Sequence, residues 1–172
     1  MSELRRVITG HGPDGRSKVS IDSAPLDGVA PLLEVWAAQA GPVDSRDEAD
    51  LAAGPVRLCP SPGGSKFRYF TVEPLPAGLP PEAVEAAFAQ GFAAIGAADA
   101  RVDTRRHPAM HRTSSLDYII VLKGEVTLLL DDGEVHLKPF DVVVQRGTNH
   151  GWVATGPEPA LLAAILIDAE VK

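Results

Sequence analysis

The sequence is poor in the residues on which several large classes of protein depend. It contains a single cysteine, Cys59, in 172 residues, so no internal disulfide can form, and we expect a cytoplasmic setting in which thiols stay reduced. Its 16 lysines and arginines are outnumbered by 23 acidic residues, which gives a formal net charge of −7. Because nucleic-acid recognition depends on clustered cations that neutralise phosphates, we expect no nucleic-acid partner.

Long apolar runs are missing as well. No stretch approaches the roughly 20 consecutive apolar residues that cross a bilayer, and no apolar segment follows Arg5 and Arg6. We therefore expect neither a secretion signal nor a membrane partner. With 45% hydrophobic and 23% charged residues, the composition is that of one ordinary globular domain.

The stretch from His107 to Ala154 contains four runs rich in valine, isoleucine and leucine. Turn-forming segments separate them at residues 123–125, 131–133, 138–141 and 146–149. The Asp-Gly pair in the second of these is a strong hairpin signal, because glycine accepts the positive φ of tight turns. Short strands at even spacing with no helix between them predict an antiparallel sandwich or barrel.

The first hundred residues predict extra strands and one helix. A Gly-Pro-Asp-Gly turn divides residues 4–21 into a hairpin, and residues 32–36 and 67–73 favour strands. Residues 81–96 change to a helical period, with Pro81 suited to a first helical position. We expect this helix to lie across an open end or an outer face of the barrel. No internal repeat is present, so we expect one structural domain, with an extension (1–100) packed on a barrel core (101–172).

Two motifs in the second half of the chain resemble those of the cupin family. The first family motif is His-x-His, a short gap, Glu and then Gly, and it is matched here by His111, Thr113, Asp117 and Gly124. The second, Gly, a gap and then Pro-x-Gly-x-x-His-x-x-x-Asn, is matched by residues 145–150, with Gln145 in place of Pro, Phe140 near the expected first Gly and Ala154 in place of Asn. The match is closest to small, single-domain microbial cupins. This resemblance implies an all-β fold, the cupin double-stranded β-helix or jelly-roll barrel.

Strand alternation predicts which side chains meet inside such a barrel. Asp117 shares its parity with Ile119 and Val121, so an inward apolar face also turns Asp117 inward. A carboxylate in that setting is costly unless it is paired, hydrogen-bonded or bound to metal. His111, Asp117 and His150 would together form a two-histidine, one-carboxylate site for Fe(II), Mn(II), Ni(II) or Zn(II).

Two alternatives stay open at this site. Thr113 is a poor metal ligand, so the three side chains could instead form a metal-free polar cluster that orients an organic ligand. His107, four residues before His111, could also replace the histidine that the family motif has at Thr113.

Side chains expected on the same inward face would form a largely apolar pocket for a small-molecule ligand. These are Met110, Thr113, Ile119, Val121, Leu128, Val143 and Trp152. Gln145 and Arg146 would orient the substrate, and a neighbouring Arg112 is a further cation that could hold a substrate carboxylate.

The resemblance implies a metal-dependent enzyme of the dioxygenase, decarboxylase or isomerase type, acting on a small organic acid or ketone. The alternative is a module that binds a small molecule without turnover. Homodimerisation is also implied, because cupin barrels commonly pair through sheet edges or N-terminal strands.

Overall fold

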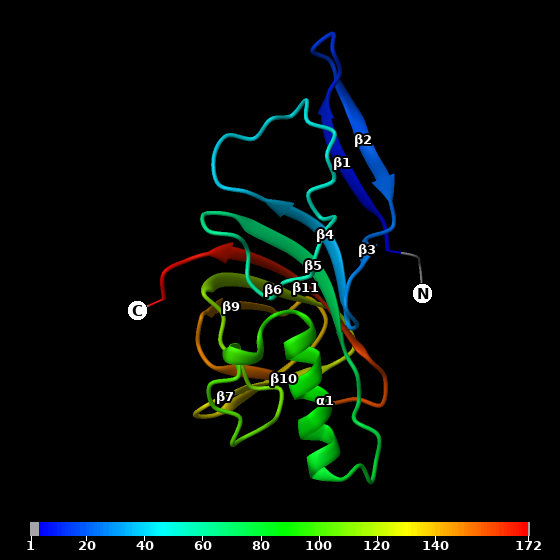
Figure 1. Cartoon of the computed structure of the whole chain (residues 1–172). Helices are drawn as coiled ribbons and strands as arrows, with labels where there is room; N and C mark the ends of the chain where they lie inside the picture. The colour runs from blue at the N-terminus through cyan, green and yellow to red at the C-terminus, as the bar shows by residue number, and fades with distance from the viewer. Residues whose placement is uncertain (1–3, 172) are drawn as a thin grey trace.

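Two antiparallel sheets pack face to face in the computed structural model, which describes residues 4–171 (Figure 1). The larger sheet has the strand order β3 (Leu26–Asp27), β4 (Leu32–Ala38), β5 (Ser65–Val72), β11 (Ala160–Asp168), β6 (Ser115–Lys123) and β9 (Val142–Arg146). The smaller sheet has the order β10 (His150–Ala154), β7 (Val126–Leu130) and β8 (Glu134–Leu137). The fold is the predicted all-β jelly-roll barrel.

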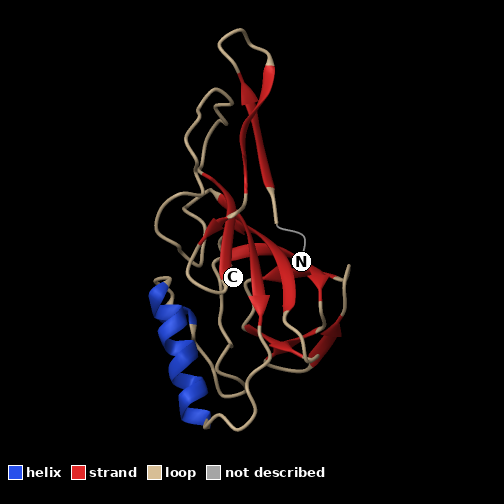
Figure 2. Ribbon diagram, turned by 90° about the vertical axis from the view of Figure 1, so that its right-hand side faces the viewer, coloured by secondary structure: helices blue, strands red, loops and turns tan. Residues whose placement is uncertain are grey.

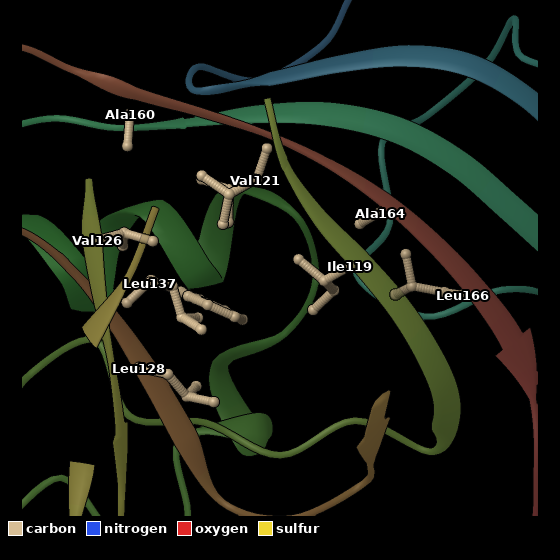
Figure 3. Packing of buried hydrophobic residues seen from close by; sticks show 10 residues of the cluster. Ile119, Val121, Val126, Leu128, Leu137, Ala160, Ala164 and Leu166 are labelled. Atoms are coloured by element: carbon tan, nitrogen blue, oxygen red, sulfur yellow. The ribbon is translucent and has the colours of Figure 1, made fainter. Parts of the chain in front are cut away.

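The hydrophobic core lies between these two sheets. Ile119 and Val121 of β6 point toward Val126 and Leu128 of β7, and the small residues of β11 fill the space beside them (Figure 3). Burying each large aliphatic side chain contributes about 1.5–3 kcal/mol. Along β6 burial alternates strictly at residues 115, 117, 119 and 121, so the predicted inward face is confirmed, and Asp117 lies on it.

Strands from both halves of the chain build the larger sheet. β11 pairs with β5 on one side and with β6 on the other. The boundary that we expected near residue 100 therefore runs through one continuous sheet, because β4 and β5 precede it and β6, β9 and β11 follow it.

A separate hairpin of β1 (Arg6–His11) and β2 (Ser17–Ser23) projects away from the barrel (Figure 1). Its base is held by Arg6, whose buried guanidinium pairs with Asp50 and donates to the Val35 carbonyl at 3.1 Å. The hairpin that the Gly-Pro-Asp-Gly turn predicted is therefore confirmed.

One α-helix, α1 (Pro81–Ala94), lies along one side of the barrel, beside its end (Figure 2). It ends two residues before the predicted boundary, because Gly96 takes a positive φ of 66° and the Ala97 N–H donates back to the Phe92 carbonyl at 2.8 Å. No residue of α1 is fully buried. In the described part of the chain no helix has the length and apolar character needed to cross a membrane.

Candidate functional site

Two histidines from the two sequence motifs lie side by side near the end of the barrel. The His111 N–H donates to the His150 carbonyl at 2.8 Å, and the His150 N–H donates back to the His111 carbonyl at 2.9 Å. This reciprocal backbone pairing fixes the two imidazole rings with their centroids 4.3 Å apart. Backbone hydrogen bonds therefore hold the two histidines next to each other.

Each imidazole is also held by the backbone through its Nδ1 atom. Nδ1 of His111 lies 2.9 Å from the Ala109 carbonyl, and Nδ1 of His150 lies 2.9 Å from the Thr148 carbonyl. A carbonyl only accepts, so Nδ1 carries the proton and Nε2 presents a lone pair. Within residues 4–171 neither Nε2 has a hydrogen-bond partner.

Burial keeps both imidazoles neutral. Desolvation lowers the pKa of His111, and the hydrogen bond that Nδ1 donates to the Ala109 carbonyl only partly offsets this. Desolvation, reinforced by the neighbouring His111, lowers the pKa of His150 to about 3. At neutral pH the pair therefore offers two uncharged nitrogen acceptors.

Asp117 lies on the inward face of β6. Its Oδ2 accepts a hydrogen bond from the Thr113 hydroxyl at 3.2 Å, while its Oδ1 is buried without a partner. Desolvation raises the pKa of this carboxyl, and the hydroxyls of Ser115 and Thr113, followed by the charge of Arg68, oppose that shift. Thr113, which stands where the family motif has a histidine, thus serves as a hydrogen-bond donor to Asp117.

Arg68 is a site residue that the sequence reasoning missed. It lies on β5 directly opposite Glu34 of β4, and the two form a buried ion pair with Nη2 and Oε1 2.8 Å apart. Nη2 also donates to the Arg57 carbonyl at 2.6 Å, whereas the buried Nε has no partner. The signal was present, because Arg68 has the same strand parity as Phe70 and Val72, both of which pack against the core.

A cavity of about 530 Å³ joins these groups. Its wall is mostly apolar and includes Phe88 and Phe92 of α1 and Ile95, the residue that follows the helix, so the helix forms one side of it. The Phe92 ring lies 4.8 Å from the ring of His111. His111, Thr113, Asp117, His150 and Arg68 all line this one space, which has the size and character of a small-molecule site.

Four of the seven residues expected at the pocket do not line this cavity. Thr113, Ile119 and Trp152 are on its wall, but Met110 is fully buried elsewhere. Val121 and Leu128 belong to the core, and Val143 packs against it. Strand alternation correctly predicted that Val121, Leu128 and Val143 face inward. It does not predict whether an inward side chain lies in the core or at the cavity.

The two residues expected to orient a substrate also lie away from the cavity wall. Arg146 is exposed on the outer face, because it alternates with the buried Gln145 along β9. Gln145 donates to the Thr148 carbonyl at 3.2 Å, the same carbonyl that holds Nδ1 of His150. The expectation that Arg146 orients a ligand in the cavity is therefore corrected, and Gln145 acts on the turn before His150.

His107 lines the cavity, against α1. Its ring lies 5.6 Å from that of Phe88, and its Nδ1 accepts a hydrogen bond from the Ala109 N–H at 3.1 Å. This bond places the proton of a neutral imidazole on Nε2, the opposite tautomer from that of His111 and His150. His107 therefore does not repeat the geometry of the histidine pair.

The side chains at this site are of the types that bind a divalent transition metal, but only two of them lie close enough together to share one ion. Neutral imidazoles whose second nitrogen is held by a carbonyl are typical metal ligands, and the orphaned Oδ1 of Asp117 is a suitable oxygen donor. Among the described residues, however, no three histidine, cysteine, aspartate or glutamate side chains lie close enough to hold one ion. The histidine pair supplies two ligands as it stands, and Asp117 does not complete the set.

The fold and site define a small jelly-roll barrel with an imidazole pair in a largely apolar cavity. Residues 100–167 match the family model described as "Cupin domain". This part of the chain is therefore similar to the cupin domain family.

Curated relatives match over short segments. "Phomopsin biosynthesis cluster protein C'" of Diaporthe leptostromiformis is 64% identical over 44 residues, which is 25% of this chain and 23% of the relative. "Cupin-domain-containing oxidoreductase virC" of Hypocrea virens is 42% identical over 65 residues, 36% of this chain and 34% of the relative. The match thus spans about a quarter to a third of each relative's length. A solved cupin 2 conserved barrel domain protein from Salinispora arenicola is 18% identical, with a TM-score of 0.38 over 66% of this chain and 73% of that one.

Proposed function

We propose that the chain is a small-molecule enzyme that binds a small, largely apolar organic acid or ketone in the cavity beside α1 and acts on it at the imidazole pair. The observation that carries this proposal is the pair itself: two neutral Nε2 acceptors in an apolar cavity. Several relatives are named cupin-domain-containing oxidoreductases, which supports oxidoreduction as the class of reaction.

The chain's own residues would perform three tasks in this reaction. The wall of the cavity, with Phe92 and Trp152, would hold the apolar body of the substrate and exclude water. Nε2 of His111 and Nε2 of His150 would hold the group that acts on the substrate, because each lone pair is free while Nδ1 is fixed. The Thr113 hydroxyl would keep Asp117 oriented on the same wall.

We also propose a divalent transition metal, Fe, Mn, Ni or Zn, held by His111, His150 and Asp117. When bound, such an ion supplies Lewis acidity and, if redox-active, a route for electrons. The donor chemistry supports this proposal, and binding would require Asp117 to approach the imidazole pair, since no group of three ligands is assembled among the residues described.

Metal analysis tests this part of the proposal. After incubation with each ion and removal of the excess, we expect about one ion per chain for the preferred metal. His111→Ala and His150→Ala should each lose it, because each removes one of only two preassembled ligands. The matched control is His136→Ala, since His136 is half exposed and pairs with Glu125. A protein that holds no stoichiometric metal, or that retains it in both cavity variants, would contradict the metal site.

The second candidate function is a module that holds a small molecule in the same cavity without turnover. The incomplete ligand set favours it. A metal-free protein that binds ligand unchanged in His111→Ala and His150→Ala would support this function over the enzyme.

We further propose that the chain forms a homodimer through the outer face of the larger sheet. Val142 and Val144 on the edge strand β9 are 68% and 56% exposed, and Tyr118 of β6 pairs with Val144 beside them. Light scattering at micromolar concentration should give the mass of two chains. Val142→Lys together with Val144→Lys should reduce it to one, whereas Val43→Lys in an exposed loop should not. A monomeric parent protein would refute the dimer.

A further inference from the structure

The buried guanidinium of Arg68 is the only lysine or arginine side chain that lines the cavity in the part of the chain described. Arg68 is 2% exposed, so its hydrogen-bonding groups cannot all turn to bulk water. Nη2 is committed to Glu34 and to the Arg57 carbonyl, and Nε is enclosed without a partner. Nη1 forms no hydrogen bond with residues 4–171 and is not enclosed, so it is the nitrogen available to a ligand.

The charge of Arg68 is already neutralised. Glu34 lies 2.8 Å from it on the adjacent strand, and both side chains are buried. The other formal charges on the cavity wall are the carboxylates of Asp117 and of Glu73, which is at the exposed rim. A ligand carboxylate bound here would lose its hydration, which is costly. No unpaired cation among the described residues of the cavity wall would offset that cost.

An uncharged acceptor avoids this cost. A carbonyl oxygen loses far less on desolvation than a carboxylate, and it can still accept a hydrogen bond from a charged donor, which is stronger than a bond between neutral groups. The apolar wall around Arg68, including Phe70 and Leu166, would take the hydrocarbon part of the same molecule.

We propose that Arg68 is the polar anchor of the cavity and that it selects an uncharged carbonyl compound, a ketone or an aldehyde, over the corresponding carboxylate. This inference rests on the proposed function, in which the cavity binds a small molecule, and it narrows the substrate class from organic acid or ketone to the carbonyl compound. Arg68 donates through Nη1, and Glu34 holds the guanidinium in place and cancels its charge.

Pairs of ligands that share a hydrocarbon ring and differ only in the polar group test the inference. The pairs are acetophenone with benzoate and cyclohexyl methyl ketone with cyclohexanecarboxylate. Toluene serves as the compound with no hydrogen-bond acceptor. Binding is followed by ligand-detected NMR titration at neutral pH on protein treated with EDTA, so that only the chain's own charges act. We expect the ketones to bind at least about tenfold more tightly than the carboxylates.

The protein variants separate the role of Arg68 from that of the cavity. Arg68→Met alone leaves Glu34 buried and unpaired, so the binding variant is Arg68→Met with Glu34→Leu, which removes both charges at similar volume. In it the ketones should bind no more tightly than toluene. Arg105→Met, which removes a cation that is exposed on the surface, should leave the preference for ketones intact.

The outcomes distinguish this inference from the proposed function. Carboxylates that bind as tightly as ketones, or a ketone preference that survives in the double variant, would overturn the role of Arg68. Toluene binding without ketone binding would overturn it too, while leaving the cavity as a small-molecule site. If none of the compounds binds, the inference fails together with the proposed function.

Discussion

Replacing Arg68 by methionine is expected to destabilise the protein by about 3–5 kcal/mol, because it leaves the carboxylate of Glu34 buried without its partner. Both side chains are almost fully buried, and the pair spans the adjacent strands β4 and β5. Glu34→Leu should lower the free energy of unfolding by a similar amount, because it leaves the guanidinium of Arg68 buried without its partner. Chemical denaturation of the single variants measures both losses.

The double variant decides whether the loss comes from the unpaired charge. Arg68→Met with Glu34→Leu removes both charges, and apolar replacements of a buried pair are often neutral or stabilising. We expect its free energy of unfolding to lie within about 1–2 kcal/mol of the parent value. The matched surface control is Arg5→Met, which breaks an exposed pair with Asp22 and should leave the free energy of unfolding nearly unchanged, because solvent screens such a pair. If the two single losses simply add in the double variant, the ion-pair explanation is wrong.

Gly124→Ala is the second substitution with a large expected effect. Gly124 turns the chain between β6 and β7 with φ of 73°, and a Cβ there would come within 2.7 Å of the Ala160 Cα and 2.8 Å of the Pro159 carbonyl oxygen. Left-handed backbone costs a residue with a Cβ about 1–2 kcal/mol. The collision is with backbone atoms, which cannot move aside as a side chain can, so we expect a total loss of about 3–4 kcal/mol.

Gly133→Ala is the matched control for the collision. Gly133 has a similar φ of 86°, but nothing lies within 4 Å of its missing Cβ. It should therefore lose only the conformational part, about 1–2 kcal/mol. Thermal unfolding of the two variants should give a clearly lower midpoint for Gly124→Ala, and equal midpoints would show that contact with Pro159 and Ala160 is unimportant.

Gly124 illustrates how much of the fold could be predicted from the sequence. The turn signals set the strand boundaries, and the family motif placed a glycine where the structure has no room for a side chain. Alternation along β6 placed Asp117 on the same face as Ile119. These are local properties, so one stretch of sequence was sufficient to predict them.

The candidate site depended on information that local patterns do not hold. The ion pair of Arg68 arises from the register of β4 against β5, and register is set by the whole sheet. Arg146 was misplaced although its neighbour Gln145 was correctly turned inward, because adjacent residues of a strand face opposite ways. Val121 and Leu128 face inward as expected but lie in the core, since the position of the cavity depends on where α1 packs.

The position of β11 in the larger sheet bears on how the chain is made. β11 lies between β5 and β6 in the sheet but follows both of them in the sequence. β5 and β6 are therefore synthesised before the strand that joins them. During synthesis the apolar edges of β5 and β6 therefore stay unprotected until residues 160–168 have emerged, and closure then requires pairing across long sequence separations, which is slow. Until then β5 and β6 each present an open edge that can pair with a strand of another chain, which is a route to aggregation.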